Sequence, residues 1–110
     1  MKQYVIDELR PEDYLKIKAY LDANCRTAGI SGVYWLEMKA ELLSDEQRSH
    51  IQCQPYYFGL ELEEESLACG LLVRAASNIR CHCIAYANRE QRNWLVDTID
   101  SIMESLGIIS

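Results

Sequence analysis

The sequence predicts an α+β domain of two layers, in which a mainly antiparallel sheet carries helices packed on one face. Residues 55–87 alternate with period two and contain three adjacent strand patterns separated by turn residues. Two capping-box patterns, at Ser44–Gln47 and Asn88–Gln91, mark the starts of helices. The predicted element order is β-α-β-α-β-β-β-α, which is typical of an α+β fold. The length of 110 residues suits a single domain that spans residues 1–110.

The first half of the chain alternates strands and helices. Residues 2–9 alternate as a strand does, and Pro11 then suits the first turn of a helix, where its missing N–H costs nothing. The helix is expected to run to Asn24 and to bury one stripe: Tyr14, Ile17, Leu21 and Cys25. A loop at residues 26–32 leads to a short strand at residues 33–38.

The second half begins and ends with helices. Ser44 begins a short polar helix that ends near Gln52, and Asn88 begins the last helix. Gly107 ends that last helix. Its apolar stripe comprises Trp94 or Leu95, Ile99, Ile102, Met103 and Leu106. We therefore expect the last helix to cover the apolar face of the three strands.

The register of these three strands follows from their turns. Pairing Leu62 with Leu67 and Ala75 with Ile79 assigns every side chain to one of two faces. The predicted inner face comprises Phe58, Leu60, Leu62, Leu67, Cys69, Leu71, Val73, Ile79, Cys81, Cys83 and Ala85. The predicted outer face comprises Tyr57, Gly59, Glu61, Ala68, Gly70, Leu72, Arg74, Arg80, His82, Ile84 and Tyr86.

Two glycines make the outer face the candidate site. Gly59 lies opposite Gly70 in this register, and a glycine inside a strand often marks the close approach of another chain or a ligand. The solvated face of an antiparallel sheet is usually polar, whereas this one carries several apolar side chains. Three occupants remain open: the chain's own helices, a second protein, or a small molecule.

The cysteines suggest packing rather than metal binding. Cys81 and Cys83 share a face of their strand, but His82 points away from both, so these residues do not converge on one ion. His50 and Cys53 are three residues apart on the short helix, and no third residue that would orient the histidine can be named. We expect the thiols of Cys25 and Cys53 to react first, and those of the strand cysteines only on unfolding.

Composition narrows the class of protein. A net charge of −6 opposes binding to nucleic acid or to anionic lipid. No apolar run reaches the roughly 18 residues of a membrane-spanning helix, and the amino terminus shows no signal-peptide core. An odd number of cysteines, five, suits free thiols in a reducing cytoplasm.

Residues 4–21, especially Leu9-Arg10-Pro11-Glu12-Asp13-Tyr14, resemble the opening strand and helix of acyl-CoA acetyltransferases. The glycine-containing pyrophosphate loop of that family is absent, so the resemblance does not imply its activity. The small, acidic α/β character is also similar to that of bacterial secretion chaperones, which bind proteins and dimerise. That similarity concerns architecture and transfers no residue roles.

We interpret the chain as a cytoplasmic protein-binding module that forms a homodimer through its sheet face, without cofactor or metal. The expected contact residues are Tyr57, Gly59, Gly70, Leu72, Arg74, Arg80, His82, Ile84 and Tyr86. The alternative is a small anionic-ligand binder or enzyme. It would be centred on Glu61, Arg74, Arg80 and His82, with the histidine as the general acid–base and the arginines holding the anion.

Overall fold

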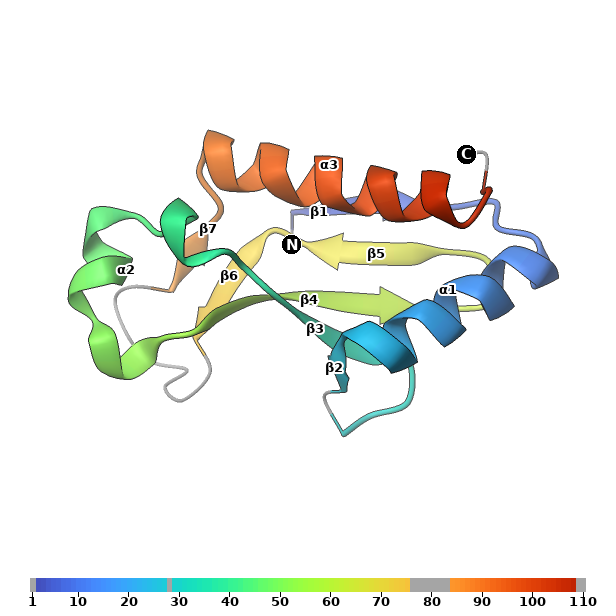
Figure 1. Cartoon of the computed structure of the whole chain (residues 1–110), viewed down its shortest axis with the longest axis horizontal. Helices are drawn as coiled ribbons and strands as arrows, with labels where there is room; N and C mark the ends of the chain where they lie inside the picture. The colour runs from blue at the N-terminus through green and yellow to red at the C-terminus, as the bar shows by residue number, and fades with distance from the viewer. Residues whose placement is uncertain (1, 28, 76–83, 109–110) are drawn as a thin grey trace.

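The computed structural model describes residues 2–27, 29–75 and 84–108, and it confirms the α+β class (Figure 1). The described strands form one open antiparallel sheet of seven strands, joined by three α-helices and two short 3₁₀ turns. The strands are β1 (Gln3–Ile6), β2 (Arg26–Thr27), β3 (Val33–Glu37), β4 (Tyr56–Leu62), β5 (Leu67–Gly70), β6 (Leu72–Ala75) and β7 (Ala85–Tyr86). The helices are α1 (Pro11–Asn24), α2 (Asp45–Ser49) and α3 (Arg89–Ser105), and the 3₁₀ turns are η1 (Ala40–Leu42) and η2 (Ile51–Cys53).

The sheet is ordered β1-β5-β4-β3-β2, and β6 pairs with both β4 and β7. Strands β5 and β6 therefore follow one another along the same edge of β4, with a break at Leu71. Leu71 bonds to other segments instead: its N–H donates to the Lys2 carbonyl at 3.0 Å, and its carbonyl accepts from the Ala87 N–H at 2.7 Å. These two bonds explain why the strand is interrupted there.

Both predicted capping boxes are present. Ser44 Oγ accepts from the Gln47 N–H at 3.2 Å, and Gln47 Oε1 accepts from the Ser44 N–H at 2.9 Å. Asn88 and Gln91 form the same reciprocal pair at the start of α3. The helices begin where they do because these side chains satisfy backbone donors that lack helical partners. Beyond α3, Gly107 adopts a left-handed φ of +73°.

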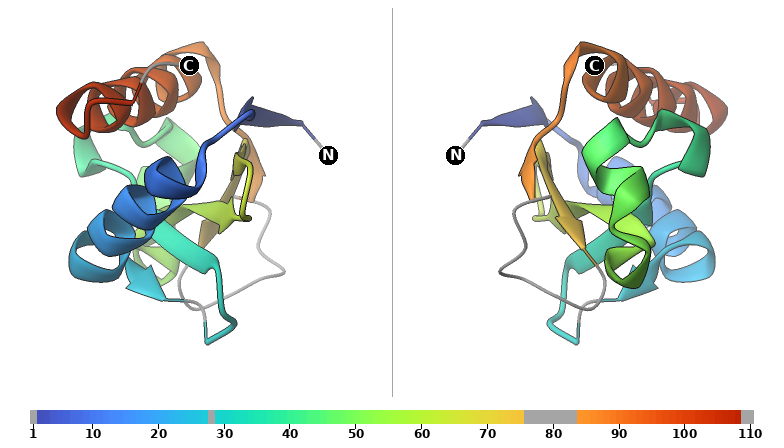
Figure 2. Two further views of the ribbon diagram at one scale, coloured as in Figure 1. Left: turned by 90° about the vertical axis from the view of Figure 1, so that its right-hand side faces the viewer. Right: turned by 90° about the vertical axis from the view of Figure 1, so that its left-hand side faces the viewer.

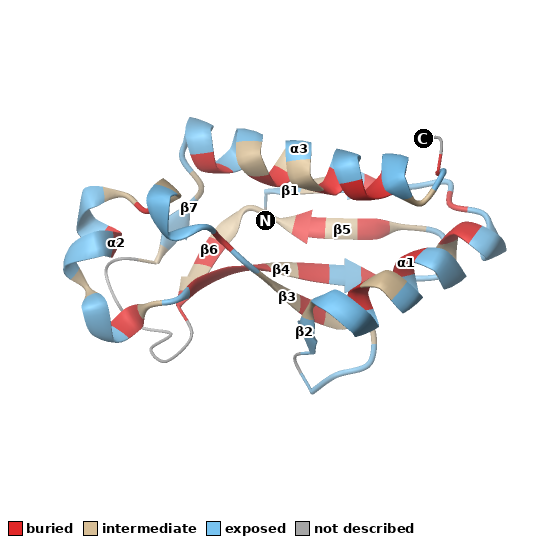
Figure 3. Cartoon of the chain, viewed as in Figure 1, coloured by how far each residue is buried: buried red, intermediate tan, exposed pale blue. Residues whose placement is uncertain are grey.

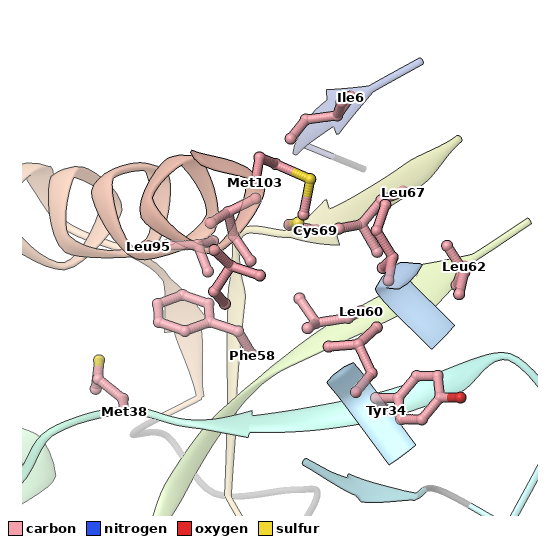
Figure 4. Packing of buried hydrophobic residues seen from close by; sticks show 14 of the residues in the cluster. Ile6, Tyr34, Met38, Phe58, Leu60, Leu62, Leu67, Cys69, Leu95 and Met103 are labelled. Atoms are coloured by element: carbon pink, nitrogen blue, oxygen red, sulfur yellow. The ribbon is translucent and has the colours of Figure 1, made fainter. Parts of the chain in front are cut away.

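The hydrophobic core lies between the helices and one face of the sheet (Figures 2 and 3). Figure 4 shows Leu95 and Met103 of α3 packed toward Phe58, Leu60 and Cys69 of the sheet. Helix α1 contributes its own buried stripe, Ile17 and Leu21, as its spacing predicted. The predicted apolar stripe of α3 is likewise buried at Leu95, Ile99, Ile102 and Met103.

The register of the first hairpin is confirmed from Leu62–Leu67 to Leu60–Cys69, and the predicted register fails in β6. Leu62 pairs with Leu67, but Tyr57 pairs with Arg74 rather than with Leu72. The break at Leu71 inserts two residues opposite β4. Because two is an even number, the side chains of β6 keep the faces predicted for them.

The last of the three predicted strands pairs with β6 in a register shifted by four residues from the predicted one. Val73 pairs with Ala85, whereas the sequence predicted Cys81. Ala85 is exposed rather than on the core face, and Ile84 packs against the buried cluster rather than on the outer face. The rest of the predicted strand and its loop, including Arg80, Cys81, His82 and Cys83, lies outside the described residues.

Two smaller predictions are also wrong. Arg26–Thr27 forms the edge strand β2 against β3, where a loop was expected. Cys53, the last residue of the turn η2, is fully buried, whereas an exposed helix end was expected. Ile51, the first residue of the same turn, is exposed.

Candidate functional site

One face of the sheet is turned away from the three helices, and Figure 2 shows no described helix over it. We call it the outer face. Strand alternation and the strand pairings assign its side chains. They are Gln3, Val5, Val33, Trp35, Glu37, Tyr57, Gly59, Glu61, Ala68, Gly70, Leu72 and Arg74.

The indole of Trp35 lies over Gly59. The two residues are cross-strand partners on β3 and β4, and a Cβ added to Gly59 would stand 3.3 Å from Trp35 Cζ3. That separation is tighter than ordinary van der Waals contact, so a larger residue at position 59 would push the ring outward. The absence of a side chain at Gly59 thus lets the indole rest against the sheet.

Tyr57 and Arg26 hold the other side of this ring. The Tyr57 and Trp35 ring centroids are 6.4 Å apart with a tilt of 54°. Arg26 Nη1 donates to the Tyr57 hydroxyl oxygen at 3.2 Å. Tyr57 is buried although it lies on the outer face. Tyr57 is thus held by a hydrogen bond, and Trp35 packs against its ring.

Trp35 forms a ridge between two open hollows. The first has a volume of about 320 Å³ and is lined by Gln3, Ile30, Val33, Trp35, Gly59, Glu61, Ala68, Gly70, Leu72 and Arg74. The second, of about 330 Å³, is lined by Asn24, Cys25, Arg26, Trp35, Leu36, Glu37 and Tyr57. A ridge with a hollow on each side is a shape that another surface can interlock with.

Two opposite charges flank Tyr57. Glu37 pairs with it on β3 and Arg74 pairs with it on β6. Two strand spacings separate the charged residues, a Cα distance of about 10 Å. Within the described residues neither has an ion-pair partner. Glu61 lies four residues further along β4, on the far side of Gly59.

The predicted site residues are only partly brought together. Gly59, Gly70, Leu72 and Arg74 line the first hollow, and Tyr57 lines the second. Tyr86 is 47% exposed, pairs with Leu72, and has the Lys2 ammonium 5.6 Å from its ring centre. Ile84 belongs with the core, while Arg80 and His82 lie outside the described residues.

The alternative site is spread out in the described part of the chain. Arg74 is level with Tyr57, whereas Glu61 is four residues away on β4, a separation of about 13 Å along the strand. The two residues stand at opposite ends of the first hollow instead of facing one anion or one substrate.

Trp35 is the residue that sequence reasoning missed. Its strand was predicted, but the pairing of that strand with β4 depends on strand order, which the sequence pattern does not contain. The one available signal was Gly59 in mid-strand, which indicated that another group approaches the sheet there. The Trp35 indole of the same chain is such a group.

In residues 2–27, 29–75 and 84–108, no group of three or more histidine, cysteine or acidic side chains is placed to hold a metal ion. Cys25 borders the second hollow, and burial raises the pKa of its thiol, which makes it a poorer nucleophile. No described helix has the length and apolar character required to cross a membrane.

Comparisons of the chain with family models, with curated proteins and with solved structures found no match. The support for any function therefore comes from the outer face.

Proposed function

We propose that this chain is a cytoplasmic protein-binding module that associates with a second copy of itself through the outer face. The observation that supports the proposal is the Trp35 ridge between two hollows on a sheet face that no described helix covers. Tryptophan, tyrosine and arginine are enriched in protein interfaces, and this face carries half-buried Trp35 and Arg74 beside the buried Tyr57. The odd number of cysteines supports a reducing compartment.

Exposed apolar side chains add to this support. The described residues include five large hydrophobic side chains that are exposed: Val5, Leu15, Ile30, Ile51 and Tyr86. Three of them belong to this surface. Val5 pairs with Ala68, Tyr86 pairs with Leu72, and Ile30 lines the first hollow. Several exposed apolar side chains on one face mark an interaction surface more reliably than isolated ones do.

The area of the outer face sets the expected affinity of the dimer. Four strands and about six residues of length give a face of roughly 20 × 20 Å, or about 800 Å² buried over two partners. That area is below the ~1,200 Å² of stable complexes. We therefore expect a reversible dimer with a Kd on the order of 10–100 µM.

Sedimentation velocity over about 5 to about 500 µM tests self-association. The wild type should shift from monomer to dimer across this range. Ile30→Arg places a charge at the rim of the first hollow and should weaken association about tenfold or more. Ile51→Arg is the matched control, since Ile51 is similarly exposed but lines neither hollow. A wild type that stays monomeric at the highest concentration would overturn the proposal.

Tryptophan fluorescence gives a second reading at the face itself. The chain has two tryptophans, and Trp94, a residue of α3, stacks on Phe58 with ring centroids 6.0 Å apart, on the core side of the sheet. In Trp94→Phe the emission comes from Trp35 alone, which should shift to the blue as the protein is concentrated because its ring loses water. An emission spectrum that does not change while dimer forms would place the interface elsewhere.

A further inference from the structure

We infer that the two copies pack outer face to outer face about a two-fold axis that runs parallel to β4. This inference rests on the proposed function and specifies which residues meet. It depends on the arrangement of side chains on the strands that flank β4.

Three rows of side chains cross the outer face. Val33 and Ala68 are the partners of Glu61, on opposite sides of β4. Glu37 and Arg74 flank Tyr57 in the same way. In the middle row Trp35 is the partner of Gly59, and Gly70, which follows Cys69 on β5, lines the first hollow on the other side.

The two flanking columns are complementary to each other. On the β3 side stand Val33, Trp35 and Glu37, and on the β5–β6 side stand Ala68, Gly70 and Arg74. Each row thus sets a larger side chain against a small one, or an acid against a base. Within the described residues of one copy, Glu37 and Arg74 form no ion pair with each other.

A two-fold axis along β4 brings these columns together. The axis places the β3 column of one copy opposite the β5–β6 column of the other, and each row opposite the same row. Such contacts are isologous. The Trp35 indoles of the two copies, each lying over its own Gly59 beside the axis, then meet each other, and Val33 of each copy lies over Ala68 of the other. Glu37 of each copy meets Arg74 of the other, so the dimer gains two equivalent ion pairs. Aligned sheets with a spacing of about 10 Å accommodate an interdigitated layer of this kind.

The same axis makes one contact unfavourable. Residues of β4 meet their own copies, so Glu61 faces Glu61 of the other copy at the edge of the face. Like charges across an interface weaken it. The competing arrangement, with the axis perpendicular to β4, would move Glu61 toward Tyr57 and Arg74 of the other copy instead. The two arrangements therefore predict opposite effects of removing the charge of Glu61.

Charge reversal and mixing provide the first test. Glu37→Arg and Arg74→Glu should each weaken self-association about tenfold or more, because each turns two attractive contacts into repulsive ones. When the two variants are mixed in equal amounts, both contacts become attractive again, and a 1:1 heterodimer of about wild-type affinity should form. Sedimentation of the single variants and of the mixture, each shown to be folded by circular dichroism, measures this.

Glu61→Gln provides the second test. We expect it to tighten the dimer by about two- to fivefold. Weaker association of Glu61→Gln, or no recovery on mixing while the wild type still dimerises, would reject the axis along β4 and leave self-association standing. A monomeric wild type would reject the proposed function itself.

Discussion

Gln91 donates from Nε2 to Oε1 of Gln47 at 2.9 Å, across 44 residues of sequence. Each glutamine is the third residue of its own helix and closes its capping box, so this bond joins the first turns of α2 and α3. Gln91 Nε2 also donates to the Leu42 carbonyl of η1 at 2.9 Å, and its side chain is buried. Three segments are therefore held at one point by a single buried amide.

Gln91→Leu should lower the free energy of unfolding by about 1–3 kcal/mol, because it leaves buried carbonyl oxygens without their donor. Urea denaturation measures the change. Asn93→Leu is the control, since Asn93 lies on the exposed side of the same helix and should change stability by about 0.5 kcal/mol or less. Equal costs for the two variants would show that the amide link contributes nothing.

The caps and the helices were predictable because their signals are local. The capping residues of α2 lie within four positions of sequence, as do those of α3, and the stripe of α3 repeats at helical spacing. The bond between Gln47 and Gln91 has no local signal, since either residue could cap its helix without meeting the other. The sequence therefore predicted both capping boxes, but it did not predict the hydrogen bond that joins them.

The sheet shows the same division. The Leu62–Leu67 register follows from a tight turn and was predicted, whereas the break at Leu71 is caused by Lys2 and Ala87, which come from distant parts of the chain. The outer face was still identified on β4, β5 and β6 because the register error there was an even number of residues. Trp35 could not be assigned to it without the order of the strands.

Gly32 and Gly29 form a matched pair for testing the β3 entry. Both have a left-handed φ, +83° and +81°, but a Cβ on Gly32 would lie 2.8 Å from the Leu62 carbonyl oxygen, while one on Gly29 meets nothing within 4 Å. Gly29→Ala should therefore cost only the left-handed conformation, about 1–2 kcal/mol. Gly32→Ala should cost about 1–3 kcal/mol more, because the backbone must move.

The difference between the two glycine variants is measured by urea denaturation of both under one set of conditions. The Leu62 N–H donates to the Gly32 carbonyl at 2.7 Å, so any shift of the backbone also weakens this bond. Equal losses of stability would mean that the loop yields to the added methyl group without strain.

The cysteines should label in an order set by burial. Cys53 and Cys69 are fully buried, and burial raises the pKa of Cys69 to about 12, so neither should react with a thiol reagent in the native protein. Among the three cysteines in the described residues, Cys25 is half-buried and should react first, although more slowly than an exposed thiol. Labelling resolved by peptide mass spectrometry reads each cysteine separately, before and after unfolding in urea. Native labelling of Cys69 as fast as that of Cys25 would contradict the placement of β5 against α3.

Asp22 is held ionised by two donors, and this gives a prediction in acid. Lys18 Nζ lies 2.9 Å from one carboxylate oxygen, and the Tyr34 hydroxyl donates to the other at 2.6 Å. Both bonds, chiefly the one from Lys18, lower the pKa of Asp22. A group whose pKa is lower in the folded state stabilises the fold above its unfolded pKa and loses that contribution as the pH falls through its folded pKa. The free energy of unfolding of Asp22→Asn should therefore depend less on pH in this acidic range than that of the wild type.

NMR titration of the Asp22 carboxyl carbon measures its pKa directly. The pKa should be higher in Lys18→Met than in the wild type, and it should rise less in Tyr34→Phe. A larger rise in Tyr34→Phe would reverse the assigned order of the two donors, and no rise in either variant would show that the bonds do not persist in solution.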